Sequence, residues 1–182
     1  MKKLSIFIIL ISLTINTFAI EKLKKNEGYL LVALNVEKGY LPKYVELSGE
    51  GLFSKTIKLD SLQPYLNYWL VRVKSGTYRW EKIFFNKRLY LDIDDSNYDI
   101  KVKSGKINYG GHLSLYSEMN SSRNEILGGA RLNFNNKSSK ALSYLEYEYT
   151  ELLQNYELVY SGSEKDHFFN FLKTQGVLFS EE

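Results

Sequence analysis

Short stretches in which apolar and polar residues alternate recur along most of this chain. In "YLLVALNV", every second residue from Leu30 to Val36 is apolar, so these side chains would share one face of an extended strand. Similar sets follow, separated by clusters of Gly, Pro, Asn, Asp or Ser: Val45 and Leu47; Ile57 and Leu59; Trp69, Val71 and Val73; Tyr98, Ile100 and Val102. Short alternating strands divided by such turns are typical of a β-sandwich or a barrel.

The phrase Val-Lys-Ser-Gly occurs twice, as "VKSGTYRW" from Val73 and as "VKSGKINY" from Val102. In each copy an alternating strand ends at the valine, and a strand with aromatic residues follows the glycine. Gly76 and Gly105 can adopt the positive φ that tight turns often require, so we expect two hairpin-like corners in which both glycines are structural. A phosphate-binding loop is not indicated, because neither a helix nor a Gly-Lys-Ser/Thr motif follows. Alternation after the first corner predicts that four side chains share one face: Tyr78, Trp80, Lys82 and Phe84.

A glycine pair, Gly110 and Gly111, interrupts the strand that resumes as "HLSLYSEM". Glycines inside a strand predict a bulge, a bend or a close approach of two backbones. The stretch "GGARLNF" then offers one more alternating set, which contains Ala130, Leu132 and Phe134.

Helical spacing replaces the alternation near the C-terminus. Apolar residues three and four apart predict a helix over residues 138–155, with Ser138 or Ser139 as its N-cap. The stretch "YELVY" predicts a short strand. A final helix is expected through "HFFNFLK", with Ser163 as its cap and Asp166 three residues later.

The first residues have the features of a secretory signal peptide. Lys2 and Lys3 form a charged start, residues 4–13 are mostly apolar, and Thr17 and Ala19 suit cleavage after position 19. We therefore expect an exported protein that is periplasmic or secreted. A retained anchor is the alternative, which we disfavour because the apolar run is shorter than about 20 residues and is broken by Ser, Thr and Asn.

Composition narrows the possible functions. Of the 24 basic residues, two lie before the expected cleavage site, which leaves 22 against 21 acidic residues. This near-neutral balance predicts no nucleic-acid partner, and membrane contact only through an uncleaved signal sequence. The chain has no cysteine, so disulfides, thiolate metal sites and a cysteine nucleophile are excluded.

The segments "GYLLVALNV", "LVRVKSGTYRW" and "VKSGKINYGGHL" together resemble uncharacterised bacterial exported proteins. Those proteins carry an immunoglobulin-like sandwich related to carboxypeptidase-regulatory, or transthyretin-like, domains. The resemblance covers roughly residues 28–135 and brings no catalytic residues with it. This chain departs from the group at Ser75 and Ser104, where proline is common, and at His112, where an acidic residue is expected. The matching corner residues are Val73, Gly76, Tyr78, Val102, Gly105, Lys106 and Tyr109.

The expected fold is mainly β, an immunoglobulin-like antiparallel β-sandwich with two C-terminal helices, and α+β overall. The two helices would cover part of a sheet or an open edge. The expected segments are a signal peptide (1–19), a linker (20–27), the sandwich (28–135) and a helix–strand–helix unit packed on it (136–182).

Candidate metal-binding and catalytic residues are few. His112 and His167 lack a His-x-x-x-His spacing, so no zinc site is expected. The acidic run "DIDDSNYD" imitates the start of a calcium loop, but Asn97 stands where glycine is needed and Lys103 where glutamate is needed. No cofactor is expected, and whether a metal binds Asp92, Asp94 or Asp95 is left open.

No catalytic residue is predicted, since no Gly-x-Ser-x-Gly elbow or comparable signature is present. A hydrolase is the second alternative and would need one of the two histidines in a cleft with a carboxylate.

Aromatic residues give the one functional indication. The chain has 15 tyrosines, a residue favoured at recognition surfaces, although an AT-rich genome would also explain the number. We expect a non-catalytic structural or protein-interaction module that binds another envelope protein or a surface polymer. The first alternative is a carbohydrate or small-ligand binder. The candidate interaction aromatics are Tyr40, Tyr44, Tyr65, Tyr68, Trp69 and Trp80.

Overall fold

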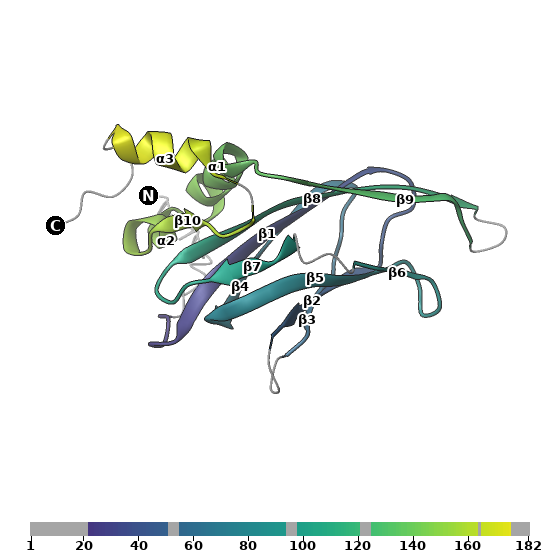
Figure 1. Cartoon of the computed structure of the whole chain (residues 1–182), viewed down its shortest axis with the longest axis horizontal. Coiled ribbons are helices and arrows are strands. Elements are labelled where there is room, and N and C mark those ends of the chain that lie inside the picture. Colours follow the sequence, from purple (N-terminus) through teal and green to yellow (C-terminus); the bar gives the residue numbers. More distant parts are fainter. Residues whose placement is uncertain (1–21, 51–54, 94–97, 121–124, 164, 176–182) are drawn as a thin grey trace, which may run out of the picture.

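The computed structural model describes residues 22–175 except 51–54, 94–97, 121–124 and 164, so the expected signal peptide lies outside it. The described chain is mainly β, with two five-stranded sheets and three helices (Figure 1). The strands and helices are β1 (Glu27–Lys38), β2 (Tyr44–Gly49), β3 (Ile57–Leu59), β4 (Tyr65–Lys74), β5 (Gly76–Phe84), β6 (Tyr90–Asp92), β7 (Ile100–Val102), β8 (Ile107–Asn120), β9 (Glu125–Asn135), α1 (Ser138–Glu148), α2 (Thr150–Asn155), β10 (Leu158–Tyr160) and α3 (His167–Thr174).

The first sheet, sheet A, has the order β10–β8–β1–β4, and β9 pairs with the far half of β8. The second, sheet B, has the order β3–β2–β5–β6, and β7 also pairs with β5. Sheet B is antiparallel in every described pair. In sheet A, however, β8 runs parallel to both β1 and β10, so the expectation of an all-antiparallel fold is wrong for this sheet.

Both copies of the Val-Lys-Ser-Gly phrase carry the chain from one sheet to the other. The first joins β4 in sheet A to β5 in sheet B, and the second joins β7 in sheet B to β8 in sheet A. Gly76 and Gly105 have the expected positive φ, +152° and +68°. The phrases therefore form corners between sheets, whereas a hairpin joins neighbouring strands of one sheet.

The two corners lie on either side of the start of β1. The backbone N–H of Ser75 donates to Asn26 O, and that of Gly105 donates to Glu27 O, both at 2.8 Å. Since the second corner places the start of β8 beside the start of β1, the two strands run in the same direction. This entry point is the physical reason for the parallel pairing.

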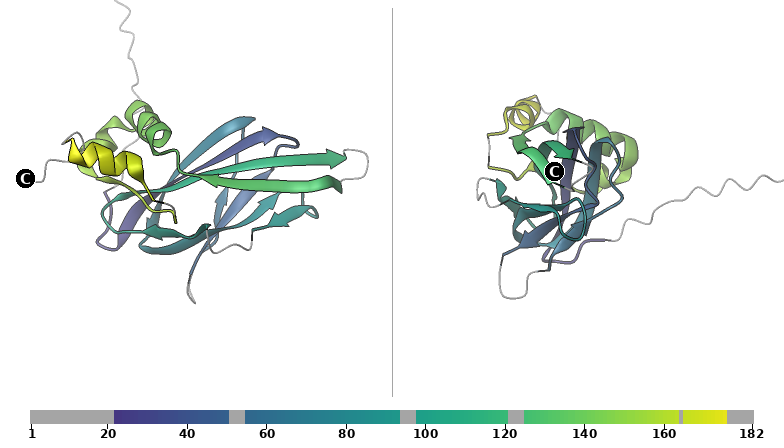
Figure 2. Two further views of the ribbon diagram at one scale, coloured as in Figure 1. Left: turned by 45° about the horizontal axis from the view of Figure 1, so that its top comes forward. Right: turned by 90° about the vertical axis from the view of Figure 1, so that its right-hand side faces the viewer.

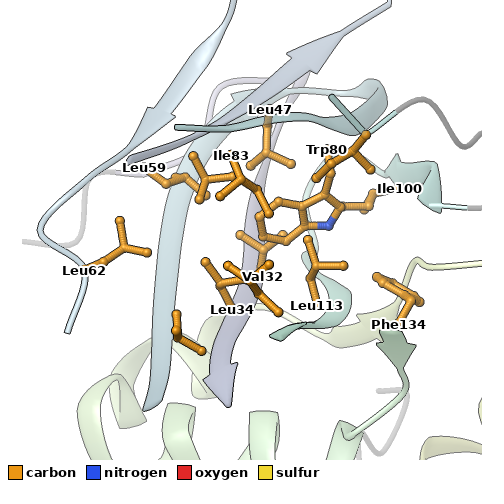
Figure 3. Close-up of a cluster of buried hydrophobic side chains, with 14 of the residues drawn as sticks. Val32, Leu34, Leu47, Leu59, Leu62, Trp80, Ile83, Ile100, Leu113 and Phe134 are labelled. Carbon is orange, nitrogen blue, oxygen red and sulfur yellow. The ribbon is translucent and has the colours of Figure 1, made fainter. Parts of the chain in front are cut away.

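An apolar core fills the space between the two sheets. Trp80 from sheet B lies at its centre, and residues from both sheets surround it (Figure 3). Alternate residues of β1, from Leu30 to Val36, face this core as the pattern predicts. The other face of β1, including Leu31, packs against the helical layer, so residues 30–34 are fully buried. Burial on both faces explains why this strand is nearly continuously apolar.

A bulge in β5 overturns one expectation from the sequence. Glu46 of β2 pairs with Lys82, and the next residue of β2, Leu47, pairs with Trp80, so Glu81 is an extra residue on β5. One extra residue reverses the faces of all side chains beyond it. Trp80 therefore enters the core, whereas Lys82 and Phe84 lie on the opposite, outer face of sheet B.

The three helices lie over one end of sheet A and leave the end formed by β8 and β9 uncovered (Figures 1 and 2). Together they bury residues of the second apolar cluster, among them Leu145 in α1, Leu152 in α2 and Phe169 in α3. In the described part of the chain, none of these helices has the length and apolar character needed to span a membrane.

The expected single helix over residues 138–155 is divided into α1 and α2 at Tyr149, whose φ of −142° and ψ of 43° are not helical. Neither predicted serine is the cap of α1. Lys137 occupies the cap position without a side-chain bond, and Asn136 Oδ1 accepts from the backbone N–H of Ser138.

The predicted cap of the final helix is also corrected. Asp166, and not Ser163, caps α3 by accepting from the backbone N–H of Phe169 at 2.9 Å. The Asp166 carboxylate also accepts from the Ser138 hydroxyl at 2.7 Å, which links the starts of α1 and α3.

Candidate functional site

A histidine and two tyrosines form a hydrogen-bonded group beneath α1, on the outer face of sheet A. The Tyr68 hydroxyl lies 3.1 Å from Nε2 of His112, and the Tyr109 hydroxyl bonds to Nδ1 of the same ring. The backbone N–H of Lys137 donates to Tyr109 Oη at 3.1 Å. Since that oxygen already accepts this bond, we assign its own proton to the bond with Nδ1, so that His112 carries its proton on Nε2.

A bulge in β8 places Tyr109 and His112 on the same face. Residues three apart in a regular strand point to opposite faces. In the pairing with β1, Tyr109 lies opposite Leu31 and His112 lies opposite Ala33, so β8 has one extra residue over this step. The bulge predicted from the glycine pair is therefore present, and it brings the two rings together.

Each glycine of the pair has its own reason to lack a side chain. A Cβ on Gly110 would lie 2.6 Å from Cδ1 of Ile100, which belongs to the core between the sheets. Gly111 has a φ of +91°, and a Cβ there would overlap the ring of Phe134. Both the close approach and the unusual backbone conformation are thus real at this bulge.

Burial sets the protonation of the group. Burial, helped by the nearby charges of Lys137 and Lys140, lowers the pKa of His112 to about 4. It also raises the pKa of Tyr68 to about 12 and raises the pKa of Tyr109. All three side chains are therefore neutral at pH 7, and Tyr144 of α1 stacks on Tyr68 with ring centroids 4.2 Å apart.

The two histidines lie in different surroundings. His112 has no exposed surface, and both of its ring nitrogens are hydrogen-bonded to tyrosines, so the ring offers neither nitrogen to a metal or a substrate. His167 is exposed at the first position of α3. Across the described residues, no group of three or more His, Cys, Asp or Glu side chains is arranged to hold a metal ion.

The acidic run is only partly described, since Asp94 and Asp95 lie outside the described residues. Asp92 pairs with Lys82 at 3.5 Å, and Asp99 pairs with Arg79 at 2.9 Å. These two carboxylates therefore already contact cationic side chains of the protein.

A polar pocket of about 250 Å³ opens on the uncovered end of the outer face of sheet A. Its floor is Ser114 and Tyr116 of β8, flanked by Glu37 of β1 and by two residues of β9, Arg131 and Asn133. In the ladder, Ser114 lies opposite Asn133 and Tyr116 lies opposite Arg131, so the pocket spans three adjacent strands. The arrangement combines an acid, a base, an amide and two hydroxyls, which suits a small polar ligand.

Two features of this pocket depend on irregular or costly local structure. Val36 pairs with Leu115 and Lys38 pairs with Tyr116, so Glu37 is an extra residue that bulges from β1. Ser114 is almost fully buried, and its hydroxyl has no hydrogen-bond partner in the described structure. This pocket was not predicted from the sequence. Leu113 and Leu115, which alternate with Ser114 and Tyr116 along β8, face the core between the sheets.

The aromatic residues on the outer face of sheet B form a closed stack. Tyr44 and Phe84 pair across β2 and β5 with ring centroids 4.4 Å apart, and Phe84 contacts Tyr90 at 5.4 Å. The ammonium of Lys58 covers Tyr44 at 4.4 Å, and that of Lys82 covers Tyr90 at 5.1 Å. Since the ring faces are turned toward one another or toward lysines, this row does not present a flat surface for a sugar.

The candidate interaction aromatics lie in different surroundings. Tyr40 and Tyr65 are exposed, at 48% and 72%, while Tyr44 belongs to the stack described above. Tyr68 lies beneath α1, and Trp69 is half-buried with its indole N–H donating to Asp60 O. Trp80 has no exposed surface, so the prediction that it contacts a partner is wrong: the bulge in β5 turns it into the core.

The outer edge of sheet A is formed by β4, which pairs with β1 and with no other described strand. Ser75 N donates to Asn26 O in this ladder, so the hydrogen-bonded positions of β4 are the odd-numbered ones. The even-numbered residues, from Leu66 to Lys74, point their backbone N–H and C=O groups away from β1. Among these outward groups, Lys74 O accepts from the Tyr78 hydroxyl at 2.9 Å.

Comparisons with family models, with curated proteins and with solved structures found no match to this chain.

Proposed function

We propose that this chain is a non-catalytic interaction module that acts outside the cytoplasm and binds an extended segment of another envelope protein along β4. The observation that carries the proposal is the long open edge of this strand. The charged and apolar start of the sequence supports export. The two sheets that share one core, with corners between them, support the immunoglobulin-like sandwich.

The edge of β4 lacks the features that usually protect an edge strand. It is 10 residues long and contains no proline, and its charged residues, Arg72 and Lys74, lie only at its end. A row of outward backbone groups of this length is a template for one more strand. The edges of sheet B are shorter, because β3, β6 and β7 have three residues each.

Side chains on both faces of β4 would also gain burial from an added strand. Trp69 and Val71 pack only partly against the core between the sheets, and Tyr68 and Leu70 pack only partly against the helical cluster. A strand added here would extend both apolar layers at once, and apolar burial contributes about 25 cal/mol per Å². A strand added to the edge of β9 would bury less apolar surface, since the outer face of β9 carries the exposed residues Arg131 and Asn133.

Leu70 allows a specific test, because its N–H points away from β1. Leu70→Pro removes an outward donor without removing a hydrogen bond of the sheet, and an edge position tolerates proline. Leu70→Ala is the matched control, since it removes similar side-chain contacts and keeps the donor. Both purified variants should unfold cooperatively.

The measurement is crosslinking in intact cells that express the tagged exported protein, followed by mass spectrometry of the captured chains. We expect one envelope protein to be captured with the wild type and with Leu70→Ala, and to be lost with Leu70→Pro. Equal capture by the folded proline variant would refute binding along β4. Capture of this chain alone would refute a different envelope protein as the partner.

A further inference from the structure

We infer that the polar pocket on sheet A binds a free α-amino acid, whose carboxylate lies toward Arg131 and whose ammonium lies toward Glu37. The pocket lies over β8, separate from the open edge of β4, and its assignment does not depend on strand addition.

The charged side chains stand on opposite sides of the pocket. Glu37 comes from β1 and Arg131 from β9, and β8 lies between these strands. The Cα atoms of residues separated by one intervening strand lie about 9–10 Å apart, so a small molecule fits above β8 between the two side chains. A zwitterion matches both charges at once, whereas a simple anion would face Glu37 and a simple cation would face Arg131.

Lys38 adds a positive charge beside the pocket, which favours a ligand with a carboxylate. Its ammonium donates to the Tyr116 hydroxyl at 3.2 Å, and Tyr116 is part of the pocket floor. Guanidinium binds a carboxylate through two parallel hydrogen bonds, so Arg131 is the residue suited to hold it.

The Ser114 hydroxyl provides an independent indication of a ligand. A buried hydroxyl without a partner destabilises the protein, because it has lost its bonds to water. Ser114 lies at the pocket floor directly opposite Asn133, whose amide also lines the pocket. The Ser114 oxygen is covered in this structure, and rotation of the side chain about its Cα–Cβ bond would bring the hydroxyl to a carboxylate or amine above this pair.

The volume suits a single small molecule. At about 250 Å³, the pocket is smaller than those that enclose drug-sized ligands, and it is open on one side. A free amino acid fits within this space, whereas a longer ligand would extend out of the open side.

The test is an NMR titration of the full chain with each of the 20 common amino acids in turn. Two analogues of alanine each lack one charge: propionate lacks the ammonium and ethylamine lacks the carboxylate. Glucose is the neutral, hydroxyl-rich control. We expect at least one amino acid to shift the amide signals of Ser114 and Asn133 saturably. The single-charge analogues should bind at least about tenfold more weakly, since each lacks one charge-assisted contact.

Three variants connect the binding to the pocket. Arg131→Gln and Glu37→Gln, both on the exposed rim, should each lower the affinity for the tightest-binding amino acid by about tenfold or more. Lys58→Gln, on the other sheet, should leave its affinity unchanged. Ser114→Ala should weaken binding while the unliganded protein becomes no less stable, a combination that a purely structural serine would not give.

Two results would overturn the inference. One is the absence of a saturable shift at Ser114 and Asn133 with every amino acid. The other is binding that tolerates loss of either charge, including glucose binding that survives in the Arg131→Gln and Glu37→Gln variants. Loss of strand addition in the Leu70→Pro variant would leave both of these readouts unaffected.

Discussion

Tyr109 and His112 are three residues apart on one strand, yet their side chains bond to each other because a glycine bulge lies between them. The bulge also directs both rings into the layer between sheet A and α1. There the histidine bonds to Tyr68 as well, so residues from β4 and β8 are joined beneath the helix. These contacts thus join two strands of sheet A beneath the helical layer.

The bulge should depend strongly on Gly111. Gly111→Ala places a methyl group against Phe134 at a φ of +91°, so we expect a loss of about 2–4 kcal/mol in the free energy of unfolding. Gly105→Ala is the control, because its φ is also positive but nothing lies within 4 Å of the added Cβ. It should lose only about 1 kcal/mol. Equal losses in urea unfolding would contradict the proposed role of Phe134.

His112 should make stability depend on pH. Its pKa in the folded protein is about 4, below the usual histidine value of about 6.5, so between these values the unfolded chain binds a proton that the folded chain does not. The free energy of unfolding should therefore fall as pH decreases, by about 2 kcal/mol from this residue between pH 7 and pH 5.

The measurement for His112 is urea unfolding at both pH values. His112→Gln should lose this part of the pH dependence, while His167→Gln, at the exposed histidine, should keep it. If the two variants respond to pH in the same way, burial of His112 is not its cause.

The two tryptophans should differ in fluorescence. In Trp69→Phe the remaining indole, Trp80, is fully buried, so its emission should be blue-shifted and acrylamide should quench it poorly. In Trp80→Phe the remaining indole is half-buried at Trp69, and quenching should be stronger. Efficient quenching of Trp80 in the folded protein would show that the core between the sheets opens to solvent.

Asp166 should hold α3 against the rest of the helical layer. Asp166→Ala removes both the cap of Phe169 and the bond to Ser138, and the loss of a helix cap costs about 1 kcal/mol. Amide exchange in α3 should therefore become faster. Asn170→Ala, at an exposed position of the same helix, is the control and should leave exchange unchanged or slower. Faster exchange in both variants would argue against the cap.

Most strands could be predicted from the sequence, because one face of each is apolar at every second residue. The pattern at Leu30 and beyond, the positive φ of Gly105 and the bulge at Gly111 are all present in the structure. The bulge in β5 was harder to predict, because nothing in the local sequence distinguishes Glu81 as an extra residue. The bulge nevertheless places Phe84 on the face opposite to the one that alternation predicts. The parallel pairing of β1 and β8 was not predictable from alternation, which is the same in both strand directions.

The pocket was not predictable from local pattern. Alternation shows that Ser114 and Arg131 lie on the polar side of their strands, but it does not show which strands are neighbours. Glu37, Ser114 and Asn133 meet only because β8 lies between β1 and β9. The number of tyrosines suggested a recognition surface, but among the candidate interaction aromatics the structure buries Trp80 fully and Tyr68 in part.

The position of β1 in sheet A has a consequence for how the chain folds. This strand pairs with β4 and β8 and not with β2, the strand that follows it in sequence. This apolar strand therefore precedes its second partner, β8, by about 80 residues in the chain. Non-local pairing of this kind slows folding and leaves apolar surface open to aggregation in the meantime. The unfolded chain should consequently need a chaperone until β8 has paired with β1.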